Sequence, residues 1–346
     1  MTTKVCITID TEFSIGGAFG NAARLPVGEQ MVLCNVNGRS EGLGFMLDTF
    51  RRHRVQATFF VETVHRYHFR DDPMRALVHR IRDAGHDLQL HSHPCWSLFQ
   101  HADWRERARS SRRQDDYFGR SVDDSVRLIE QGVETFADWG LPRPTVFRSG
   151  NLQHDDNLYL ALARTGIPYA SNVAVAIFDS GLPDYRVYSG QHVRHGVTEF
   201  PVLTFSDWKV GGRQHLKSLT IAGTSFAETR TLLERARAAG IPLVVLLTHP
   251  FEYVQSSDSR LAHVRRHSVN QGRLTRLCQY LDQHRDRFEA VGLAQAAAAV
   301  APGPSANALV SGKLWQSLPR MATQVAYDKF GQFLLAATKG KRESVD

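Results

Sequence analysis

The sequence predicts an α/β protein whose parallel strands form a (β/α) barrel. Short apolar runs rich in β-branched residues alternate with longer segments that have apolar residues at helical spacing, an order typical of repeated βα units. Runs such as residues 243–248 are apolar throughout up to a final threonine, as expected for strands covered on both faces. Several helical segments also end at glycine, a residue favoured just after helix C-termini. In such a barrel the functional residues lie at the C-terminal ends of the strands.

The expected elements follow in chain order. The segments with the composition of strands are residues 4–9, 55–61, 86–90, 144–147, 168–171, 198–205, 243–248 and 288–292. The segments with helical spacing are residues 42–53, 73–85, 155–166 and 226–240, each lying between two of those strands. The barrel pattern then fades, and APGPSAN at residues 301–307 has the composition of a linker. We therefore expect a barrel domain over residues 1–300 and an extension over residues 301–346.

The extension is expected to end in an amphipathic helix. Its start signals are Ser317 and Pro319. One helical face then collects the apolar residues Ala322, Ala326, Phe330, Phe333, Leu334 and Ala337. We expect this helix to pack on the barrel. Because its basic residues outnumber its acids, peripheral docking on an anionic membrane or on a protein partner is the alternative.

Charge and cysteine content narrow the classes of function. The chain has 42 Lys and Arg residues against 35 Asp and Glu residues, but the arginine-rich segment 104–121 mixes both signs without interleaved aromatic residues, so we expect no nucleic-acid partner. The cysteines show no CxxC pairing and are expected to be reduced thiols; they are Cys6, Cys34, Cys95 and Cys278. No segment has the apolar core of a signal peptide or the length of a membrane span. A cytoplasmic location is therefore expected.

Two carboxylates follow the apolar part of the first strand. Asp10 and Glu12 are two residues apart in ITIDTEF, so they point to the same side of an extended chain. Like charges at one place are costly unless a cation neutralises them, and divalent metals accept oxygen ligands. A metal site is one interpretation, and an acid that caps the start of a loop is the alternative.

The third strand ends in DLQLHSHPCW, residues 87–96, where a potential metal ligand stands at every second position from His91 to Cys95. The period of two puts His91 and His93, and by extension Cys95, on one side. Pro94 suits the first position of a helix, so His93 is expected at the turn between strand and helix. A pair of imidazoles facing the carboxylates of the first strand favours a metal site over a structural role. Trp96 is expected either to pack in the core or to line the substrate pocket.

Two further strands end in basic side chains. Arg148 ends the strand in TVFRSGN, and its guanidinium could hold Asp10 ionised and oriented if Asp10 removes a proton. The alternative for Arg148 is a surface ion pair. His249 directly follows residues 243–248 and could protonate a leaving group, whereas a buried structural histidine is the alternative.

These motifs together resemble a known family. Asp10 with Glu12, then GHDLQLHSHP, FRSGN and LLTHP are similar in order and spacing to the motifs of the polysaccharide deacetylase family with the NodB homology domain. The resemblance covers roughly residues 4–295. It implies the distorted (β/α) barrel of the NodB deacetylase type, a divalent metal, and removal of acetyl groups from N-acetylated sugars, with relatives that act on other amide bonds.

The resemblance also implies roles for single residues. Asp10 corresponds to the catalytic base of the family and His91 to its first histidine ligand. Arg148 corresponds to the arginine that orients the base. His249 corresponds to the catalytic acid.

Two positions depart from the family pattern. Thr11 stands where the family has a metal-binding aspartate, so Glu12 is assigned to the metal. Cys95 stands where the family has its second histidine, one helical turn after His91. His93 is preferred as the third ligand because two histidines with one carboxylate are a common catalytic set, and Cys95 is the alternative. The expected metal is zinc, with cobalt, nickel or manganese as alternatives.

The expected function is therefore metal-dependent deacetylation of an N-acetylated sugar or a surface-polysaccharide intermediate by a metal-activated water. A hydrolase of non-sugar C–N bonds on the same scaffold and a non-catalytic carbohydrate-binding protein are the alternatives. A carbohydrate or a small amide is the expected partner. Asp207 and Trp208, which end another strand in FPVLTFSDW, are expected with Trp96 to contact the substrate.

Overall fold

The computed structural model of this chain describes residues 2–316, apart from residues 22, 111–114, 211, 212, 302, 304 and 314. The helix predicted after Ser317 lies outside the described residues. Among the described residues, no helix combines the length and the apolar character needed to cross a membrane.

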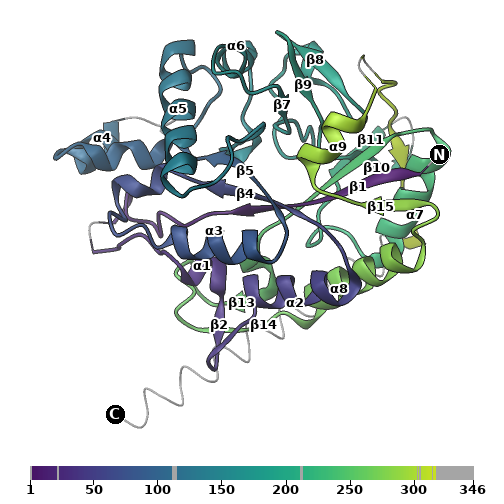
Figure 1. Ribbon diagram of the computed structural model, residues 1–346, viewed down its shortest axis with the longest axis horizontal. Coiled ribbons are helices and arrows are strands. Elements are labelled where there is room, and N and C mark those ends of the chain that lie inside the picture. The colour runs from purple at the N-terminus through teal and green to yellow at the C-terminus, as the bar shows by residue number, and fades with distance from the viewer. Residues whose placement is uncertain are drawn as a thin grey trace.

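A parallel sheet forms the centre of the molecule (Figure 1). In spatial order its strands are β12 (Leu243–Thr248), β1 (Thr3–Thr11), β4 (Thr58–Glu62), β5 (Asp87–Ser92), β6 (Val146–Ser149), β7 (Tyr169–Ala170), β9 (Val197–Glu199) and β8 (His192–Arg194). Pairing is parallel from β12 to β9, and β8 is antiparallel to β9. A further strand, β15 (Phe288–Ala290), pairs with the start of β1.

The sheet curls until its two ends meet. After β9, Phe200 N–H donates to the carbonyl of Ala170 on β7, and Leu203 N–H donates to the carbonyl of Val245 on β12, at 2.8 and 2.9 Å. A side-chain contact also crosses the interior, because Arg148 on β6 reaches Asp10 on β1 although β4 and β5 lie between them in the sheet. The structure is therefore the distorted (β/α) barrel that the sequence predicts.

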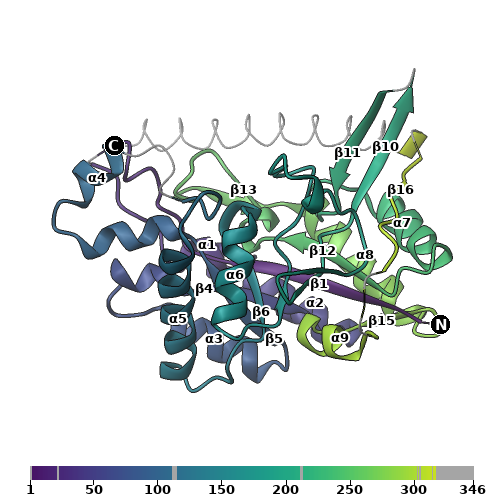
Figure 2. The ribbon, with the colours of Figure 1, turned by 90° about the horizontal axis from the view of Figure 1, so that it is seen from above.

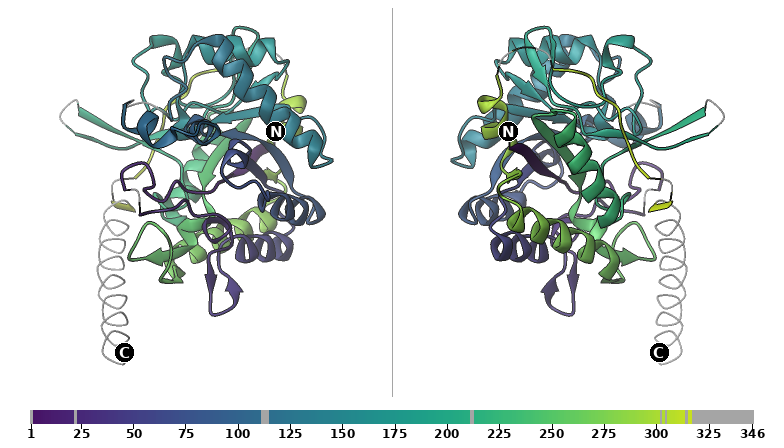
Figure 3. Two further views of the ribbon diagram at one scale, coloured as in Figure 1. Left: turned by 90° about the vertical axis from the view of Figure 1, so that its left-hand side faces the viewer. Right: turned by 90° about the vertical axis from the view of Figure 1, so that its right-hand side faces the viewer.

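Helices surround this barrel, as the views in Figure 3 show. The longer ones are α2 (Leu43–His53), α3 (Met74–Asp83), α5 (Val122–Asp138), α6 (Asp156–Arg164), α7 (Phe226–Ala238) and α8 (Ser268–Gln283), and the shorter ones are α1 (Gln30–Leu33), α4 (Trp104–Ser110) and α9 (Leu293–Ala299). The helices predicted over residues 42–53, 73–85, 155–166 and 226–240 are confirmed as α2, α3, α6 and α7. No helix was predicted at α5, although Ser121 caps it by accepting a hydrogen bond from Asp124 N–H at 3.1 Å.

Side chains alternate along β1 between the helices and the barrel interior. Val5, Ile7 and Ile9 belong to the larger apolar cluster, in which the helices pack on the sheet. Cys6 belongs to a second cluster with Phe60 of β4. Further along β1, at the C-terminal end, the same inward positions are polar. The buried core thus gives way to reactive groups at one end of the barrel.

Short 3-10 helices turn the chain directly after four of the strands. They are η1 (Val64–Tyr67) after β4, η2 (Pro94–Gln100) after β5, η3 (Gly150–Leu152) after β6 and η5 (Pro250–Tyr253) after β12, and a fifth, η4 (Pro183–Tyr185), lies farther from the sheet in sequence. The predicted turn at Pro94 is confirmed, because Pro94 begins η2. These turns keep the strand-end residues close to the barrel rather than on long loops.

In the part of the chain that the structure describes, three small sheets lie outside the barrel. β2 (Asn35–Val36) pairs with β3 (Arg39–Ser40), β13 (Val254–Ser256) pairs with β14 (Val264–Arg266), and β10 (Thr204–Val210) lies between β11 (Arg213–Ser218) and β16 (Val310–Ser311). The β10–β11 hairpin projects outward from the barrel (Figure 2). The described part of the predicted linker contacts the chain just before β8, because Gln191 N–H donates to Ser305 Oγ at 2.7 Å.

Candidate metal and catalytic site

The parallel register brings the polar strand ends together. His91 on β5 lies opposite Glu62 on β4 and opposite Arg148 on β6. In the neighbouring part of the sheet, Ile9 of β1 pairs with Thr248 of β12. The next residue of each strand, Asp10 after Ile9 and His249 after Thr248, is therefore also close to the other. Aligned residues of parallel strands point to the same face. The predicted catalytic and metal residues therefore meet at one end of the barrel.

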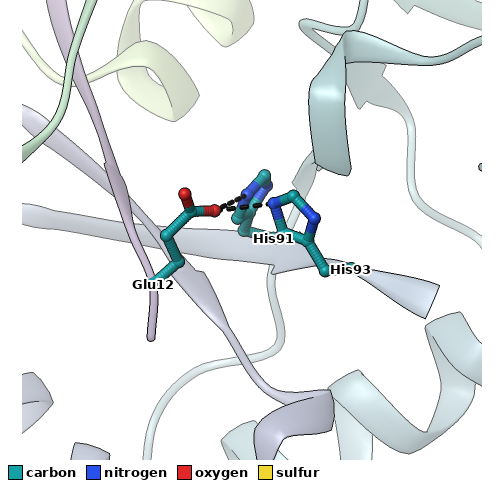
Figure 4. Close-up of side chains that lie close together, drawn as sticks. All are labelled: Glu12, His91 and His93. Carbon is teal, nitrogen blue, oxygen red and sulfur yellow. Dashed lines mark hydrogen bonds and ion pairs between the residues drawn. The ribbon is translucent and has the colours of Figure 1, made fainter. Parts of the chain in front are cut away.

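Three of the predicted ligands converge on one point (Figure 4). Nε2 of His91 lies 3.1 Å from Oε2 of Glu12, and Nε2 of His93 lies 2.6 Å from the same oxygen. One ligand atom from each of the three residues lies within 4.8 Å of the other two.

The other ring nitrogens of both histidines are engaged. Nδ1 of His91 donates to the carbonyl of Arg148 at 2.9 Å, and Nδ1 of His93 donates to Oδ2 of Asp115 at 2.7 Å. A neutral imidazole that donates through Nδ1 has only a lone pair at Nε2. Two such lone pairs and the Glu12 oxygen face one another, so the cluster needs a positive charge, either a proton or a metal ion. This donor set suits a divalent metal, whose histidine ligands are usually held through their second nitrogen.

Charges in the cluster shift the pKa values of its members. Burial opposes ionisation of Glu12, but the charge of His93 and hydrogen bonds from both imidazoles outweigh burial and hold the Glu12 pKa well below its usual value. Burial also opposes a charged His93, but Asp115 and Glu12 raise the His93 pKa well above its usual value. The carboxylates around His93 therefore favour a positive charge at the point where the three ligand atoms meet.

Arg148 forms a buried network with Asp10. Its Nη1 donates to Oδ1 of Asp10 and to Oγ1 of Thr8, both at 2.8 Å. Its other two nitrogens, Nε and Nη2, donate to the carbonyl and hydroxyl of Ser171 at 2.9 and 2.8 Å. The guanidinium also lies 4.2 Å above the ring of Phe60. Because Arg148 is completely buried, the alternative of a surface ion pair is wrong.

His249 lies on the other side of Asp10, with its Nε2 at 3.9 Å from Oδ2 of Asp10. Its Nδ1 lies 3.0 Å from Oε1 of Glu252, whose other oxygen accepts a hydrogen bond from Thr248 at 2.7 Å. Burial lowers the His249 pKa, but Glu252, together with Asp10 and Glu12, raises it to about 9. Glu252 was not among the predicted site residues, although its position three residues after His249 in a helical turn was a usable signal.

Two more carboxylates near the ligands were also missed. Glu62 accepts hydrogen bonds from Val64 N–H at 2.5 Å and from the backbone N–H of His93, and desolvation raises its pKa to about 7. Its signal was an acid placed directly after the strand at residues 55–61. Asp115 lies in the segment 104–121, where charges of both signs alternate and no pattern distinguishes this acid from its neighbours.

The two residues that depart from the family pattern are Thr11 and Cys95, and they differ in what their side chains contact. Thr11 is buried, and its hydroxyl donates to the carbonyl of Ile9 at 3.3 Å. Cys95 forms a second potential ligand group with His93 and Asp115. Burial, together with the charge of Asp115, raises the Cys95 pKa well above its usual value, which favours the thiol over the thiolate that binds metals.

The residues predicted to contact the substrate are placed differently. Trp96 is 1% exposed and packs 5.6 Å from the ring of Phe99, which corresponds to the alternative of core packing. Asp207 accepts a hydrogen bond from His215 Nδ1 at 2.6 Å, and Trp208 stacks on the ring of His215 at 5.6 Å. Both lie on the projecting hairpin, and their contact with a substrate stays a prediction.

A barrel with a base-like carboxylate, its arginine, an imidazole and a metal-type ligand set at one end has the groups of an acid–base enzyme. Residues 37–170 match the family model described as polysaccharide deacetylase. The match includes His91, His93 and Arg148. Over these residues it confirms the resemblance to the polysaccharide deacetylase family that the strand-end motifs indicated. The comparison with curated proteins gives no match.

Several solved structures also align with most of this chain. A protein from Mycobacterium smegmatis described as a polysaccharide deacetylase is 18% identical, with a TM-score of 0.47, over 89% of this chain and 95% of that one. A family 4 carbohydrate esterase from Streptomyces lividans in complex with acetate is 14% identical, with a TM-score of 0.41, over 88% and 98%. A family 4 acetyl xylan esterase from Clostridium thermocellum in complex with cobalt is 15% identical, with a TM-score of 0.39, over 90% and 98%.

Proposed function

We propose that this protein is a metal-dependent hydrolase that deacetylates an N-acetylated sugar or a surface-polysaccharide intermediate in the cytoplasm. The observation that carries the proposal is the convergence of two imidazole Nε2 atoms on Oε2 of Glu12. A buried carboxylate and arginine pair lies at the same end of the barrel. The family match over residues 37–170 supports the reaction class.

Glu12, His91 and His93 would hold the metal. Zinc accepts this combination of nitrogen and oxygen ligands, and cobalt, nickel and manganese are the alternatives. When bound, the metal would supply a Lewis acid that polarises the acyl oxygen and lowers the pKa of a water molecule.

Asp10 is proposed as the general base. Its Oδ1 is engaged by Arg148 at 2.8 Å, which orients the carboxylate so that Oδ2 is the oxygen left to accept a proton. Arg148 cannot give up its own proton at physiological pH. The arginine is therefore a positioning residue for the base rather than a second acid.

His249 is proposed as the general acid that protonates the departing amine. Its Nδ1 contact with Glu252 at 3.0 Å favours the imidazolium, which carries a proton at Nε2 on the side of Asp10. Asp10 and His249 are thus suited to opposite proton transfers in one reaction.

The test combines metal analysis with product analysis on one sample. The purified protein is expected to hold about one divalent metal per chain, because a single three-residue ligand set is proposed. It is then offered a panel of acetamido sugars and small amides, and released acetate and ammonia are measured. Acetate from the sugars alone supports the proposal, whereas turnover of the amides alone would favour a hydrolase of non-sugar C–N bonds. Binding of sugars without turnover would favour a carbohydrate-binding protein, and the absence of metal after loading with zinc, cobalt and nickel would contradict the ligand set.

A further inference from the structure

His93 lies just past the end of β5 and is held from three sides. Its backbone N–H donates to Glu62, and its Nδ1 donates to Asp115 at 2.7 Å. Its ring lies against the backbone of Gly150, where an added Cβ would come within 2.5 Å of Nδ1. These contacts fix the position and the rotation of the imidazole.

His91 and His93 obtain their Nδ1 acceptors from different sources. His91 pairs in register with Arg148 of β6 and uses its backbone carbonyl as the acceptor. The last registered pair of these strands is Ser92 with Ser149, and at Gly150 the chain leaves β6 for η3. His93 therefore lies beyond the end of the β5–β6 ladder. It uses a side-chain acceptor instead.

That acceptor comes from a segment remote in sequence. Asp115 precedes α5, and Asn151 follows β6. Oδ2 of Asp115 accepts hydrogen bonds from His93 Nδ1 and from Nδ2 of Asn151, both at 2.7 Å. Oδ1 of Asp115 accepts the backbone N–H of Cys95 at 3.3 Å. Asn151 has a φ of 54°, a left-handed conformation that asparagine tolerates better than most residues.

We infer that Asp115, anchored by Asn151, is the positioning residue that makes His93 a metal ligand. This inference rests on the proposed metal site. A carboxylate on Nδ1 fixes the tautomer with its lone pair at Nε2, and it also makes that nitrogen more basic. Asp115 thus supports His93 as the third ligand in a chain that has Cys95 where the family has its second histidine. The ligand two residues after His91 needs support from outside the barrel, and the charged segment before α5 supplies it.

The experiment measures metal binding rather than turnover. Metal-free wild-type protein and the variants Asp115→Ala, Asp115→Asn, Asn151→Ala and Asp116→Ala are titrated with Zn²⁺, and the absorption spectrum of bound Co²⁺ is recorded at saturation. Asp115→Ala is expected to weaken Zn²⁺ binding about 10–100-fold and to change the Co²⁺ spectrum. Asp115→Asn keeps an acceptor oxygen for His93 without the charge and should recover part of the affinity. Asn151→Ala should fall between Asp115→Ala and wild type, and Asp116→Ala, which removes the neighbouring acid, should bind as wild type does.

The outcomes separate this inference from the proposed function. If the wild-type protein binds no metal, both the proposed metal site and this inference fail. If wild type and Asp115→Ala bind Zn²⁺ equally, the site stands and the inference is wrong. If Asp115→Asn loses as much Zn²⁺ affinity as Asp115→Ala, the charge of Asp115 alone accounts for the loss. The claim that Asp115 positions His93 through the hydrogen bond is then also wrong. Thermal unfolding of the metal-free variants shows whether Asp115→Ala folds. If Asp115→Ala does not fold, Asn151→Ala is the variant that decides. Equal Zn²⁺ binding by Asn151→Ala and wild type would then contradict the anchoring of Asp115 by Asn151.

Discussion

Nη1 of Arg148 donates a 2.8 Å hydrogen bond to Oδ1 of Asp10, and both side chains are buried inside the barrel. A buried charge that loses its partner typically costs about 3–5 kcal/mol, so each residue depends on the other. Ser171 and Thr8 accept three further hydrogen bonds from the arginine. The pair therefore leaves Oδ2 of Asp10 as the oxygen that faces His249, at 3.9 Å.

Asp10→Asn tests the role of this carboxylate. The amide preserves the shape and can still accept a hydrogen bond from Arg148, but it cannot accept a proton. We expect the variant to keep its metal and to lose turnover about 10²–10⁴-fold, the usual contribution of a general base. Acetate release and metal content are measured on the same sample, with Asp48→Asn, an exposed acid paired with Arg51, as the control. Normal turnover by Asp10→Asn would show that Asp10 is not the base.

The pH dependence of turnover tests His249. An acid must be protonated to act, and the His249 pKa is raised to about 9, so kcat/KM is expected to fall above about pH 9. Glu252→Gln removes the carboxylate that favours the imidazolium and should lower this pKa. The alkaline fall of kcat/KM should then begin at a lower pH, while metal content stays constant. A profile of the variant that overlays the wild-type profile would exclude control of His249 by Glu252.

Gly150→Ala tests the clearance around His93. The new Cβ would lie 2.5 Å from Nδ1 of His93. The backbone on both sides of residue 150 limits how far this Cβ can move away from the ring. We expect the ring to be displaced and Zn²⁺ affinity to fall about tenfold or more, within the range seen when groups around a ligand are changed. Gly272→Ala is the matched control, because it lies in α8 with its nearest neighbour at 3.6 Å, the flexible end of Arg276. Equal metal affinity in Gly150→Ala and wild type would contradict the tight packing.

The sequence predicted the barrel and the strand-end residues because both follow from local pattern. Strand periodicity and the residue that follows each apolar run are visible in the chain, and Asp10, His91, Arg148 and His249 all occupy such positions. The C-terminal ends of parallel strands lie at one end of a barrel, so the local pattern is enough to predict that these four residues meet.

The supporting residues could not be predicted in the same way. Asp115 reaches His93 from a charged segment 22 positions later in the chain, and no periodicity connects the two. Glu62 contacts the backbone of His93 only because β4 and β5 are neighbours in the sheet. The turn of β10 and β11 away from the barrel also has no signature in FPVLTFSDW, which was interpreted as another barrel strand. Long-range pairing, rather than propensity, decides all three.

The choice between His93 and Cys95 gives the last prediction. Nε2 of His93 lies 2.6 Å from Oε2 of Glu12, whereas Cys95 lies beyond Pro94 in η2, 4% exposed and packed in the larger apolar cluster. His93→Ala should therefore weaken Zn²⁺ binding by more than the roughly 100-fold that changes around a ligand reach. Cys95→Ala should keep the metal and cost about 1 kcal/mol of stability, as typical substitutions do.

Metal titration and thermal unfolding of both variants separate the two assignments. Cys95→Ala is the natural control for His93→Ala, because both remove a potential ligand of the same short segment and only one of these ligands faces Glu12. Retention of metal by His93→Ala together with its loss from Cys95→Ala would reverse the assignment. The Cys95 thiolate would then replace the His93 imidazole as the third ligand, in the position where the family has its second histidine.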